Sequence, residues 1–423
     1  MSKSIQSEDV QALFEKVYGA APTVITRAPG RIEFIGNHTD YNEGTVLGAS
    51  IDRSVWVGLR LVEQPTMTFY SDLSKTKVTV PLDKPHKQEG DNSWVNYPLG
   101  CWVSMPVFNL KQTGGFEYLA LSDLPTGAGL SSSAAIDLAT CLAYLDATNQ
   151  TLDTQTLVKL ARYAENNFAG VPCGFLDQTV SGFGKENHLV YIDCKGPKAS
   201  TVALPKGVRF WIFNTHTKHA LVDSFYSTRH KECMDAAEAL GVKALVEVST
   251  KEMDKLEKLP SAVKLRAKHV IEEIDRVEQV MTALSKSDLK QVGELLVASH
   301  RSSQTQFENS TPELDFLVDE IIKMPHVYGA RLTGGGFGGA VLAVVSAEFS
   351  EKEADAVATN YEKKFGKKVE VLQTKTGPGA QVILSKSTPK KSQNNKTTMV
   401  ILFGIVGISV GIMAARRFFK TRF

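Results

Sequence analysis

Three short segments of the sequence hold most of the side chains that could bind a polar ligand or move a proton. The first, residues 27–44 with the sequence RAPGRIEFIGNHTDYNEG, combines a cation at Arg31 with hydrogen-bonding groups at Asn37, His38 and Asp40. A polyhydroxylated ligand needs a partner for each hydroxyl once it is desolvated. This segment therefore indicates a site for such a ligand, although His38 could instead be a satisfied structural histidine.

The second segment, residues 124–135 with the sequence LPTGAGLSSSAA, is rich in glycine and serine and carries no charge. The backbone N–H groups of such a loop, together with the N-terminus of the helix that it feeds, can hold phosphate oxygens. The segment matches neither G-x-x-x-x-G-K-[ST] nor G-x-G-x-x-G. Taken alone, a loop of this kind is more often a turn that caps a helix, so both interpretations stay open at this point.

The third segment, residues 164–184 with the sequence AENNFAGVPCGFLDQTVSGFG, places Glu165 on an expected helix and Asp177 after a glycine-bearing loop. One carboxylate could hold a metal ion, and the other could act on a hydroxyl group. The alternatives are ordinary: Glu165 as a solvated helix residue and Asp177 as a carboxylate that caps a loop.

Mixed helices and strands must position these three segments. Alternating and β-branched stretches predict strands at 23–36, 54–62, 77–82, 188–194, 208–216, 368–374 and 380–385, with another after the glycine-rich turn in 329–345. Helical periodicity predicts helices at 6–19, 134–148 and 153–168, and through most of 226–323. This order predicts an α+β body of two lobes, with the boundary near the loop 195–207.

Composition and charge exclude several classes of protein. The chain has 423 residues and a formal net charge of +2. Eight Lys or Arg and no acid follow residue 385, so the body before them carries 40 basic and 46 acidic residues, a net charge of −6. An acidic body is a poor match to nucleic acid. The five cysteines are widely spaced and form no zinc pattern, so we expect reduced structural thiols.

The end of the sequence has a different character. Residues 386–398 are polar and rich in lysine, which is typical of a linker, and residues 399–415 form an uncharged apolar run. A helix of that length would span roughly 25 Å, near the lower limit for crossing a bilayer. We therefore predict a single transmembrane helix, with a C-terminal core helix as the alternative. Gly407 and Gly411 lie on a small-residue face that could pair such helices weakly in an otherwise monomeric protein.

Several stretches together resemble the GHMP small-molecule kinases. GRIEFIGNHTDYNEG resembles the galactokinase signature, LPTGAGLSSSAA the shared nucleotide loop and LTGGGFGGAV the third glycine motif; AGVPCGFLDQ, KHALVDSFYSTRHKEC and WVNY are also similar to galactokinase segments. The resemblance covers roughly residues 8–385. It implies a ribosomal-protein-like α/β domain in residues 1–204 and a ferredoxin-like α+β domain in residues 205–385.

The resemblance implies a sugar-1-kinase that uses ATP and Mg²⁺, with galactose as the expected acceptor. Asp177 matches the catalytic aspartate, and Arg31 matches its arginine partner. Ser133 and Glu165 match the magnesium ligands. The remaining matches are the nucleotide-binding residues Gly127, Gly129, Ser131, Ser132, Ser133 and Trp94, and the sugar-binding residues Asn37, His38, Asp40, Gly174 and Tyr226.

Two departures from the family pattern bear on specificity and location. Galactokinases usually read G-E-H where this chain reads GNH, and Glu33 stands where asparagine is common. The family's glutamate is thought to accept a hydrogen bond from the primary hydroxyl of the sugar, so N-acetylgalactosamine or an arabinose-like sugar is an alternative substrate. A non-catalytic sensor of galactose and ATP is a further alternative, although binding alone needs neither Asp177 nor Arg31.

The predicted membrane segment is the second departure, because these kinases are normally soluble. The N-terminal sequence lacks the apolar core of a signal peptide. We therefore expect a tail-anchored protein whose kinase part lies on the cytosolic face of a membrane. In a eukaryote, the mitochondrial outer membrane or the endoplasmic reticulum would be the candidates.

Overall fold

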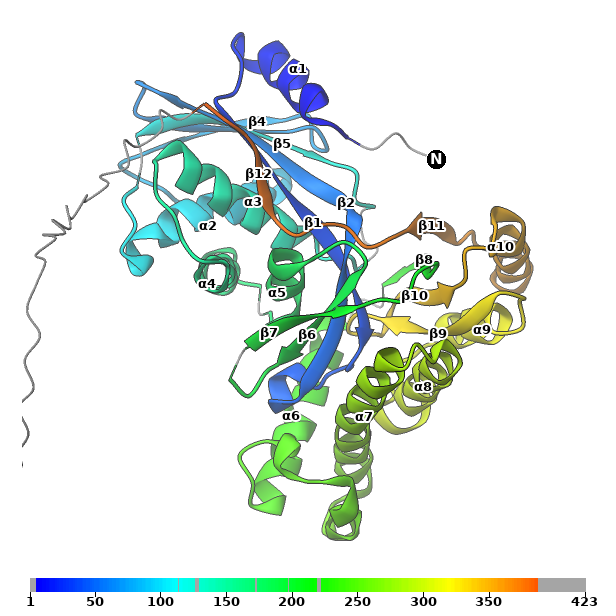
Figure 1. The fold of residues 1–423 in the computed structure, drawn as a ribbon. Coiled ribbons are helices and arrows are strands. Elements are labelled where there is room, and N and C mark those ends of the chain that lie inside the picture. Colours follow the sequence, from blue (N-terminus) through cyan, green and yellow to red (C-terminus); the bar gives the residue numbers. More distant parts are fainter. Residues whose placement is uncertain are drawn as a thin grey trace, which may run out of the picture. The chain divides into compact units, whose positions relative to one another are not determined.

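The computed structural model describes residues 5–112, 114–125, 129–171, 173–196, 198–218 and 222–386. These residues belong to one compact unit, Met1–Ser387 (Figure 1). The predicted linker after Lys386 and the predicted membrane segment 399–415 lie outside the described residues. Within the described part, no helix combines the length and the apolar character that a membrane crossing requires.

The first sheet has eight strands. They are β1 (Val24–Ile35), β2 (Thr45–Val62), β3 (Thr66–Ser71), β4 (Lys77–Pro81), β5 (Gly115–Ser122), β6 (His188–Asp193), β7 (Lys198–Ala203) and β12 (Gln381–Ser385). The order is β12-β1-β2-β5-β3-β4, while β6 pairs with β2 and β7 with β6. Only β3 and β5 are parallel among these pairs. Strand β12 thus returns from the far end of the described chain to pair with β1.

Helices cover both faces of this sheet because successive side chains of a strand point to opposite faces. Ile25 and Trp56 pack with Phe14 of α1 (Ser7–Tyr18), whereas Val24 and Val57 belong to the larger core on the other face. That second face is covered by α3 (Ser132–Ala147) and α5 (Leu176–Phe183), and α2 (Asn96–Ser104) and α4 (Thr154–Ala164) pack against α3. Figure 1 shows α1 and α3 on opposite sides of the strands.

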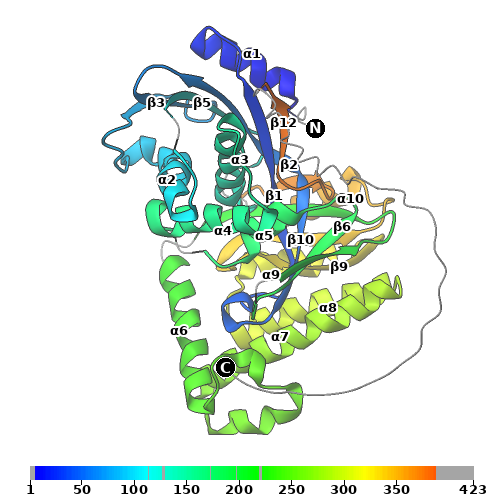
Figure 2. The same ribbon diagram turned by 60° about the vertical axis from the view of Figure 1, so that its left-hand side comes forward.

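The second sheet has four antiparallel strands in the order β11-β8-β10-β9. They are β8 (Arg209–Lys218), β9 (Val327–Thr333), β10 (Gly338–Val345) and β11 (Glu370–Thr374). One face packs Trp211 and Phe213 against α9 (Pro312–Ile321) and α10 (Glu351–Phe365). The other face turns Phe210 and Ile212 toward the core that contains residues of α7 (Ser261–Ser285) and α8 (Leu289–Ser302). Figure 2 shows α7 and α8 lying side by side.

The helix α6 (Val222–Leu240) completes the second lobe by packing on α7 through a separate apolar cluster that includes Cys233, Val270 and Phe307. Two sheets, each with its own helices, confirm the predicted two-lobed α+β architecture. The prediction of a loop over 195–207 is wrong, because Lys198–Ala203 forms β7, which pairs with β6. The predicted boundary at residue 204 falls between β7 and β8 and stays a prediction, and β12 belongs to the first sheet although it lies after that boundary. All five cysteines are free.

The clearest difference from the predicted elements is the length of β2. The sequence predicts a strand over 54–62, but β2 begins at Thr45. Its first part, including Thr45–Gly48, pairs with β6, and its second part, Val55–Val62, pairs with β5. Gly48 interrupts the apolar alternation in the sequence. In the fold it lets β2 approach Val180 of α5, where an added Cβ would lie only 2.5 Å from a methyl carbon.

Candidate active site

A sharp turn follows β1 and carries the first group of predicted site residues. Gly36 has a φ of 107° and His38 a φ of 61°, both in the left-handed region. A Cβ at position 36 would lie 2.8 Å from the Cα of Val46, so only glycine fits there. The Thr39 hydroxyl lies 2.8 Å from the carbonyl oxygens of both Gly36 and Thr45, which share its one proton, and this contact closes the turn. The chain then enters the short 3₁₀ helix Asp40–Asn42.

This turn forms one wall of a polar pocket with a volume of about 250 Å³. The polar pocket brings together predicted residues that are far apart in the sequence and that come from both lobes. They are Arg31, Asn37, His38, Asp40, Ser133, Glu165, Gly174, Asp177 and Tyr226. The glycine-rich turn after β9 contributes Gly334 and Gly335.

The carboxylate of Asp177 lies in the first turn of α5 and is held on both oxygens. Arg31 approaches Oδ1, with Nε at 2.9 Å and Nη2 at 2.7 Å. The hydroxyl of Ser131 donates to Oδ2 at 2.7 Å from a residue that itself has a left-handed φ of 56°. Arg31 also donates from Nη1 to the carbonyl oxygen of Gly129 at 2.6 Å. One arginine therefore links the candidate base to the glycine- and serine-rich loop.

A second carboxylate, Asp40, lies in the same pocket beside Gly174. Burial and, to a smaller extent, the charge of Asp177 together raise the pKa of Asp40 to about 6, against hydrogen bonds from the backbone. A Cβ on Gly174 would lie 1.9 Å from Oδ2 of Asp40. Gly174 therefore makes room for the carboxylate, and a steric role of this kind is compatible with its predicted place in the sugar site.

Asn37 and His38 line the polar pocket, but protein groups occupy much of their hydrogen-bonding capacity. The Asn37 amide donates to Oε1 of Glu33 at 2.9 Å and to the carbonyl oxygen of Gly334 at 2.8 Å. Its Oδ1 accepts a hydrogen bond from Asn309 at 2.7 Å. These contacts leave Asn37 little capacity for a ligand.

His38 is engaged on both ring nitrogens. Its Nε2 lies 2.9 Å from the carbonyl oxygen of Gly335, and its Nδ1 lies 2.9 Å from the hydroxyl of Tyr41. A carbonyl oxygen can only accept, so Nε2 carries the proton. Burial lowers the pKa of His38 to about 4, which makes the ring neutral at pH 7. His38 also contacts the ring of Tyr226, with ring centroids 5.0 Å apart.

The exchange between positions 33 and 37 has a structural explanation. Glu33 is buried, and its Oε1 lies 3.2 Å from Nη2 of the fully buried Arg331. Burial raises the pKa of Glu33, while Arg331 and the hydrogen bond from Asn37 oppose that shift. The carboxylate at position 33 therefore has an internal partner, and it orients the Asn37 amide. In this chain the carboxylate at position 33 and the amide at position 37 are hydrogen-bonded to each other.

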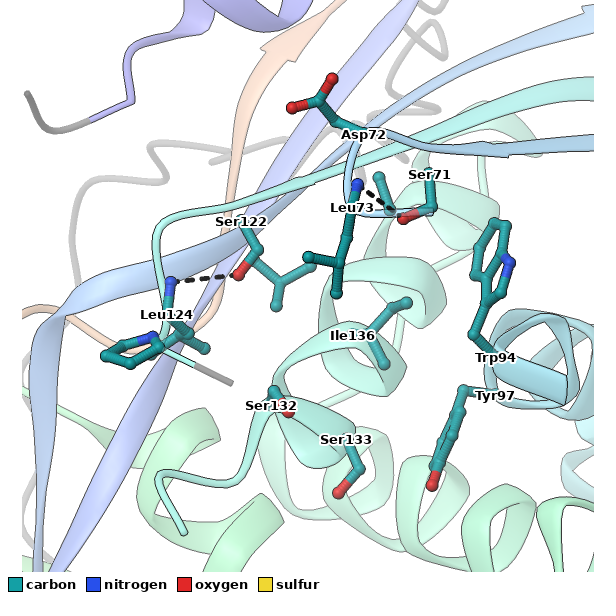
Figure 3. Close-up of a pocket in the computed structure, with 13 residues that line it drawn as sticks. Ser71, Asp72, Leu73, Trp94, Tyr97, Ser122, Leu124, Ser132, Ser133 and Ile136 are labelled. Carbon is teal, nitrogen blue, oxygen red and sulfur yellow. Dashed lines mark hydrogen bonds between the residues drawn. The ribbon is translucent and has the colours of Figure 1, made fainter. Parts of the chain in front are cut away.

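An apolar pocket of about 340 Å³ lies beside the start of α3 (Figure 3). Leu73, Trp94, Tyr97 and Ile136 supply its larger side chains, and Ser132 and Ser133 lie at its edge at the start of α3. A flat, largely apolar molecule with a phosphate at one end would match this lining. Ser133 lines both pockets, so the two pockets share this part of their walls.

The predicted nucleotide residues divide into three groups. Trp94, Ser132 and Ser133 line the apolar pocket. Gly129 and Ser131 are instead engaged by Arg31 and Asp177, as described above. Gly127 lies outside the described residues.

Ser133 and Glu165 offer oxygen donors that suit Mg²⁺, which takes few protein ligands and completes its shell with phosphate and water. Burial raises the pKa of Glu165 to about 7, against a hydrogen bond from Ser133. Asp137, one turn beyond Ser133, interacts with Glu165, and its Oδ2 is buried with no hydrogen-bond partner among the described residues. The described part of the chain has no cluster of three or more His, Cys, Asp or Glu side chains placed to hold a metal. A two-ligand site completed by phosphate therefore fits these residues.

Sequence reasoning missed several residues of both pockets. Leu73 of the apolar pocket lies in no motif and is 75% exposed, and Tyr97 was not predicted as a site residue. Cys173 lines the polar pocket, where burial raises the pKa of its thiol. The only usable sequence signals were that Tyr97 lies within the WVNY stretch and that Cys173 precedes Gly174. No pattern in the sequence distinguishes Leu73 from other surface leucines.

An apolar pocket and a polar pocket that share a wall at Ser133 suit a nucleotide and a small polar acceptor, which is the arrangement that a small-molecule kinase needs. Comparison with known families agrees. Residues 12–61 match the galactokinase galactose-binding signature, residues 96–185 the N-terminal domain of GHMP kinases and residues 280–368 their C-terminal domain.

Solved structures give the same result. The galactokinase of Lactococcus lactis, crystallised with galactose, is 32% identical, with a TM-score of 0.83, and the match covers 88% of this chain and 99% of that one. The chain belongs to the galactokinase family of the GHMP kinases. Mevalonate kinase of Methanococcus jannaschii has 17% identity and a TM-score of 0.62 over 84% of this chain and 98% of its own. A D-glycero-D-manno-heptose 1-phosphate kinase from Bacteroides thetaiotaomicron has 13% identity and a TM-score of 0.56 over 86% and 100%. These two share the fold.

Family membership fixes the class of reaction. The protein is a phosphotransferase with an alcohol group as acceptor, and its donor and metal are ATP and Mg²⁺. The two-lobed GHMP kinase fold predicted from the sequence is confirmed.

Proposed function

We propose that the protein transfers the γ-phosphoryl group of ATP to the anomeric hydroxyl of galactose. The observation that carries the proposal is the position of Asp177 and Arg31 in a polar pocket whose wall, at Ser133, is also the wall of the apolar pocket. A donor nucleotide in the apolar pocket would then place its terminal phosphate beside the acceptor hydroxyl in the polar pocket. The galactose-binding signature and the galactose-bound relative support the choice of sugar.

In this proposal Asp177 orients the attacking hydroxyl and receives its proton. The sugar oxygen forms the new bond to phosphorus as the bond between phosphorus and the ADP oxygen breaks. Arg31 contacts both Asp177 and the loop carbonyl of Gly129, so its charge is placed to offset the charge of the phosphoryl group. Ser133 and Glu165 would hold Mg²⁺, which neutralises phosphate charge when bound. Asp40, with two acceptor oxygens, would bind sugar hydroxyls.

The test is a steady-state assay of the full-length protein with ATP, Mg²⁺ and a panel of sugars: galactose, N-acetylgalactosamine, arabinose and glucose. We expect galactose 1-phosphate as product and the highest kcat/KM for galactose. The proposal would be contradicted if no sugar is turned over although calorimetry still detects binding of galactose and ATP. That result would identify a sensor and remove the proposed function.

A sugar without the primary hydroxyl is the second candidate substrate. The observation in its favour is that the Asn37 amide donates to Glu33 and Gly334 while its oxygen accepts from Asn309, so position 37 offers little free capacity to bind a primary hydroxyl. A kcat/KM for arabinose equal to or above that for galactose would decide for this candidate.

We further propose that residues 399–415 anchor the kinase to a membrane, with residues 386–398 as the linker and the catalytic part on the cytosolic side. The support is the uncharged apolar run followed by four basic residues. Full-length protein expressed in eukaryotic cells should resist carbonate extraction from the membrane pellet, and a chain ending at Lys386 should be released. Imaging of the full-length chain would distinguish mitochondrial outer membrane from endoplasmic reticulum. Recovery of both proteins in the supernatant would contradict the anchor.

Pairing of such anchors through Gly407 and Gly411 is a separate proposal that rests on the anchor itself. Crosslinking in detergent should detect dimers of the full-length protein that disappear in a Gly407→Leu/Gly411→Leu variant. If crosslinking detects only monomers for both proteins, the pairing proposal is wrong and the protein is a monomer.

A further inference from the structure

The turn that carries Asn37 and His38 is held by side chains of α7, which comes more than two hundred residues later in the sequence. Oε1 of Glu273 accepts hydrogen bonds from the backbone N–H groups of Gly36 at 3.1 Å and Asn37 at 3.2 Å. One helical turn earlier, Nε2 of His269 lies 3.2 Å from the carbonyl oxygen of Asn37. Three backbone groups of the turn are therefore paired with buried side chains of the second lobe.

Glu273 is itself fixed in place and fully buried. The hydroxyl of Ser299 donates to Oε1 at 2.6 Å, and Nε of Arg276 lies 2.7 Å from Oε2. Burial opposes ionisation, but the charges of Arg276, His269 and Arg331 and the Ser299 hydrogen bond together lower the pKa of Glu273 well below its ordinary value. A charged acceptor thus faces the turn, and its other oxygen is anchored by an arginine.

The turn needs such an acceptor because of its own geometry. With Gly36 at a φ of 107° and His38 at 61°, the chain reverses sharply and directs the N–H groups of Gly36 and Asn37 to the same side. Buried backbone N–H groups without a partner are costly, so the turn keeps this shape only while an acceptor is present. Asp40 follows the turn directly, and its carboxylate lines the polar pocket.

We propose that Glu273 is a positioning residue of the sugar site: by accepting the N–H groups of Gly36 and Asn37, it shapes the turn that places Asp40 in the polar pocket, and thereby sets the affinity for the sugar. The inference rests on the proposed function, because it takes the polar pocket as the sugar site. Glu273 does not line that pocket and acts only through the turn. To shape the turn, Glu273 must be long enough for its Oε1 to reach the two N–H groups, whereas the negative charge of its carboxylate matters less.

Two variants separate reach from charge. Glu273→Asp keeps the charge beside Arg276 but withdraws the acceptor by one methylene. Glu273→Gln/Arg276→Gln keeps the reach without the charge, because Oε1 of the new glutamine can accept both N–H groups while its amide donates to the second glutamine. Glu272→Gln is the matched control, since the neighbouring Glu272 also lies near Arg276, with 3.6 Å between Oε2 and Nη1, but has no bond to the turn among those described.

Two measurements on the full-length protein test the proposal. One is the dissociation constant of galactose by calorimetry, with the KM for ATP measured in parallel. The other is amide hydrogen exchange of a peptide that contains residues 36–40. Loss of hydrogen bonds to a charged group should weaken galactose binding about tenfold to a hundredfold in Glu273→Asp, with faster exchange at 36–40 and an ATP KM within about twofold of the wild type.

The double glutamine variant should bind galactose within about threefold of the wild type, and so should Glu272→Gln. Galactose binding that stays normal in Glu273→Asp, or that is lost in the double variant although the protein is folded, would overturn the proposal. Failure of the proposed function is distinguishable because it is measured on the wild type alone: wild-type protein would then turn over no sugar, whether or not it binds galactose. Exchange at 36–40 would still respond to Glu273→Asp in that case.

Discussion

The apolar pocket and the polar pocket are built in different ways. All residues that line the apolar pocket lie between Val55 and Ile136, within the first lobe. The polar pocket takes residues from Arg31 to Gly335 and so depends on both lobes. The first pocket offers shape and apolar surface, whereas the second offers carboxylates and an arginine.

This difference predicts how the two sites respond to change. An apolar pocket loses affinity roughly in proportion to the contact area that is removed. A polar pocket depends on a few hydrogen bonds with defined geometry, each of which leaves an unpaired group when it is broken. Substitutions in the polar pocket should therefore have larger effects, and those at residues that contact only the sugar should leave ATP binding unchanged.

Asp177→Asn should have the largest effect. The amide can still receive a hydrogen bond from Arg31, but it cannot take the proton of the sugar hydroxyl. We expect kcat to fall by about a thousandfold, with smaller changes in both KM values. The same assay on Asp275→Asn, an exposed position on α7, should give wild-type kcat. Turnover that survives in Asp177→Asn would remove Asp177 from the mechanism.

Gly174→Ala should come next and should act on the sugar alone. The new Cβ would lie 1.9 Å from Oδ2 of Asp40 and force that carboxylate away. We expect the KM for galactose to rise about tenfold to a hundredfold, with an unchanged KM for ATP. Gly196→Ala, where an added Cβ meets nothing within 4 Å, is the control. A comparable rise in the KM for ATP would show that the two pockets are not separable.

The pH dependence of sugar binding should follow Asp40. Burial raises its pKa from the ordinary value of 3.8 to about 6. The ionised carboxylate accepts hydrogen bonds from the sugar, and it is lost as the pH falls through 6. The KM for galactose should therefore rise about tenfold between pH 7.5 and pH 5.

Asp40→Asn supplies the control for this pH profile, because an amide does not titrate. It should bind galactose weakly and show a flat KM across the same range. A wild-type KM that stays constant down to pH 5 would contradict the assignment of the pH dependence to Asp40.

Leu73→Ala should have the smallest effect and should act on ATP alone. Leu73 is 75% exposed in the apolar pocket, so a bound nucleotide would cover it. Removing this contact should raise the KM for ATP about threefold to tenfold without changing the KM for galactose. Val107→Ala tests an exposed residue away from both pockets, and it should change neither value. Equal ATP affinity in Leu73→Ala and wild type would mean that the nucleotide lies elsewhere.

Much of the candidate site could be predicted from the sequence because its residues occur in short motifs. Arg31, Asp40, Ser133, Glu165 and Asp177 were all expected, and all line the polar pocket. The predictions for Asn37 and His38 were less complete. The sequence shows an amide and an imidazole, but only the fold shows that Glu33, Gly334, Gly335 and Asn309 occupy most of their hydrogen-bonding groups.

The fold was predictable where periodicity is strong and less so elsewhere. The helix at the N-terminus and the strands of the second sheet follow apolar patterns that the sequence displays directly. The full length of β2 and the return of β12 to β1 depend on pairing between distant segments. A local pattern carries no information about which strand will be the neighbour.

The sequence by itself therefore determined the family, the class of chemistry and the candidates for the reacting groups, because these depend on residue types within contiguous motifs. The tertiary structure decided how those groups are held: Asp177 between Arg31 and Ser131, Asp40 in the space left by Gly174, and the turn at Gly36 on Glu273. The physical reason is that buried polar groups must find partners. In this protein the partners lie tens to hundreds of residues away along the chain, where only the packing of two lobes brings them within hydrogen-bonding distance.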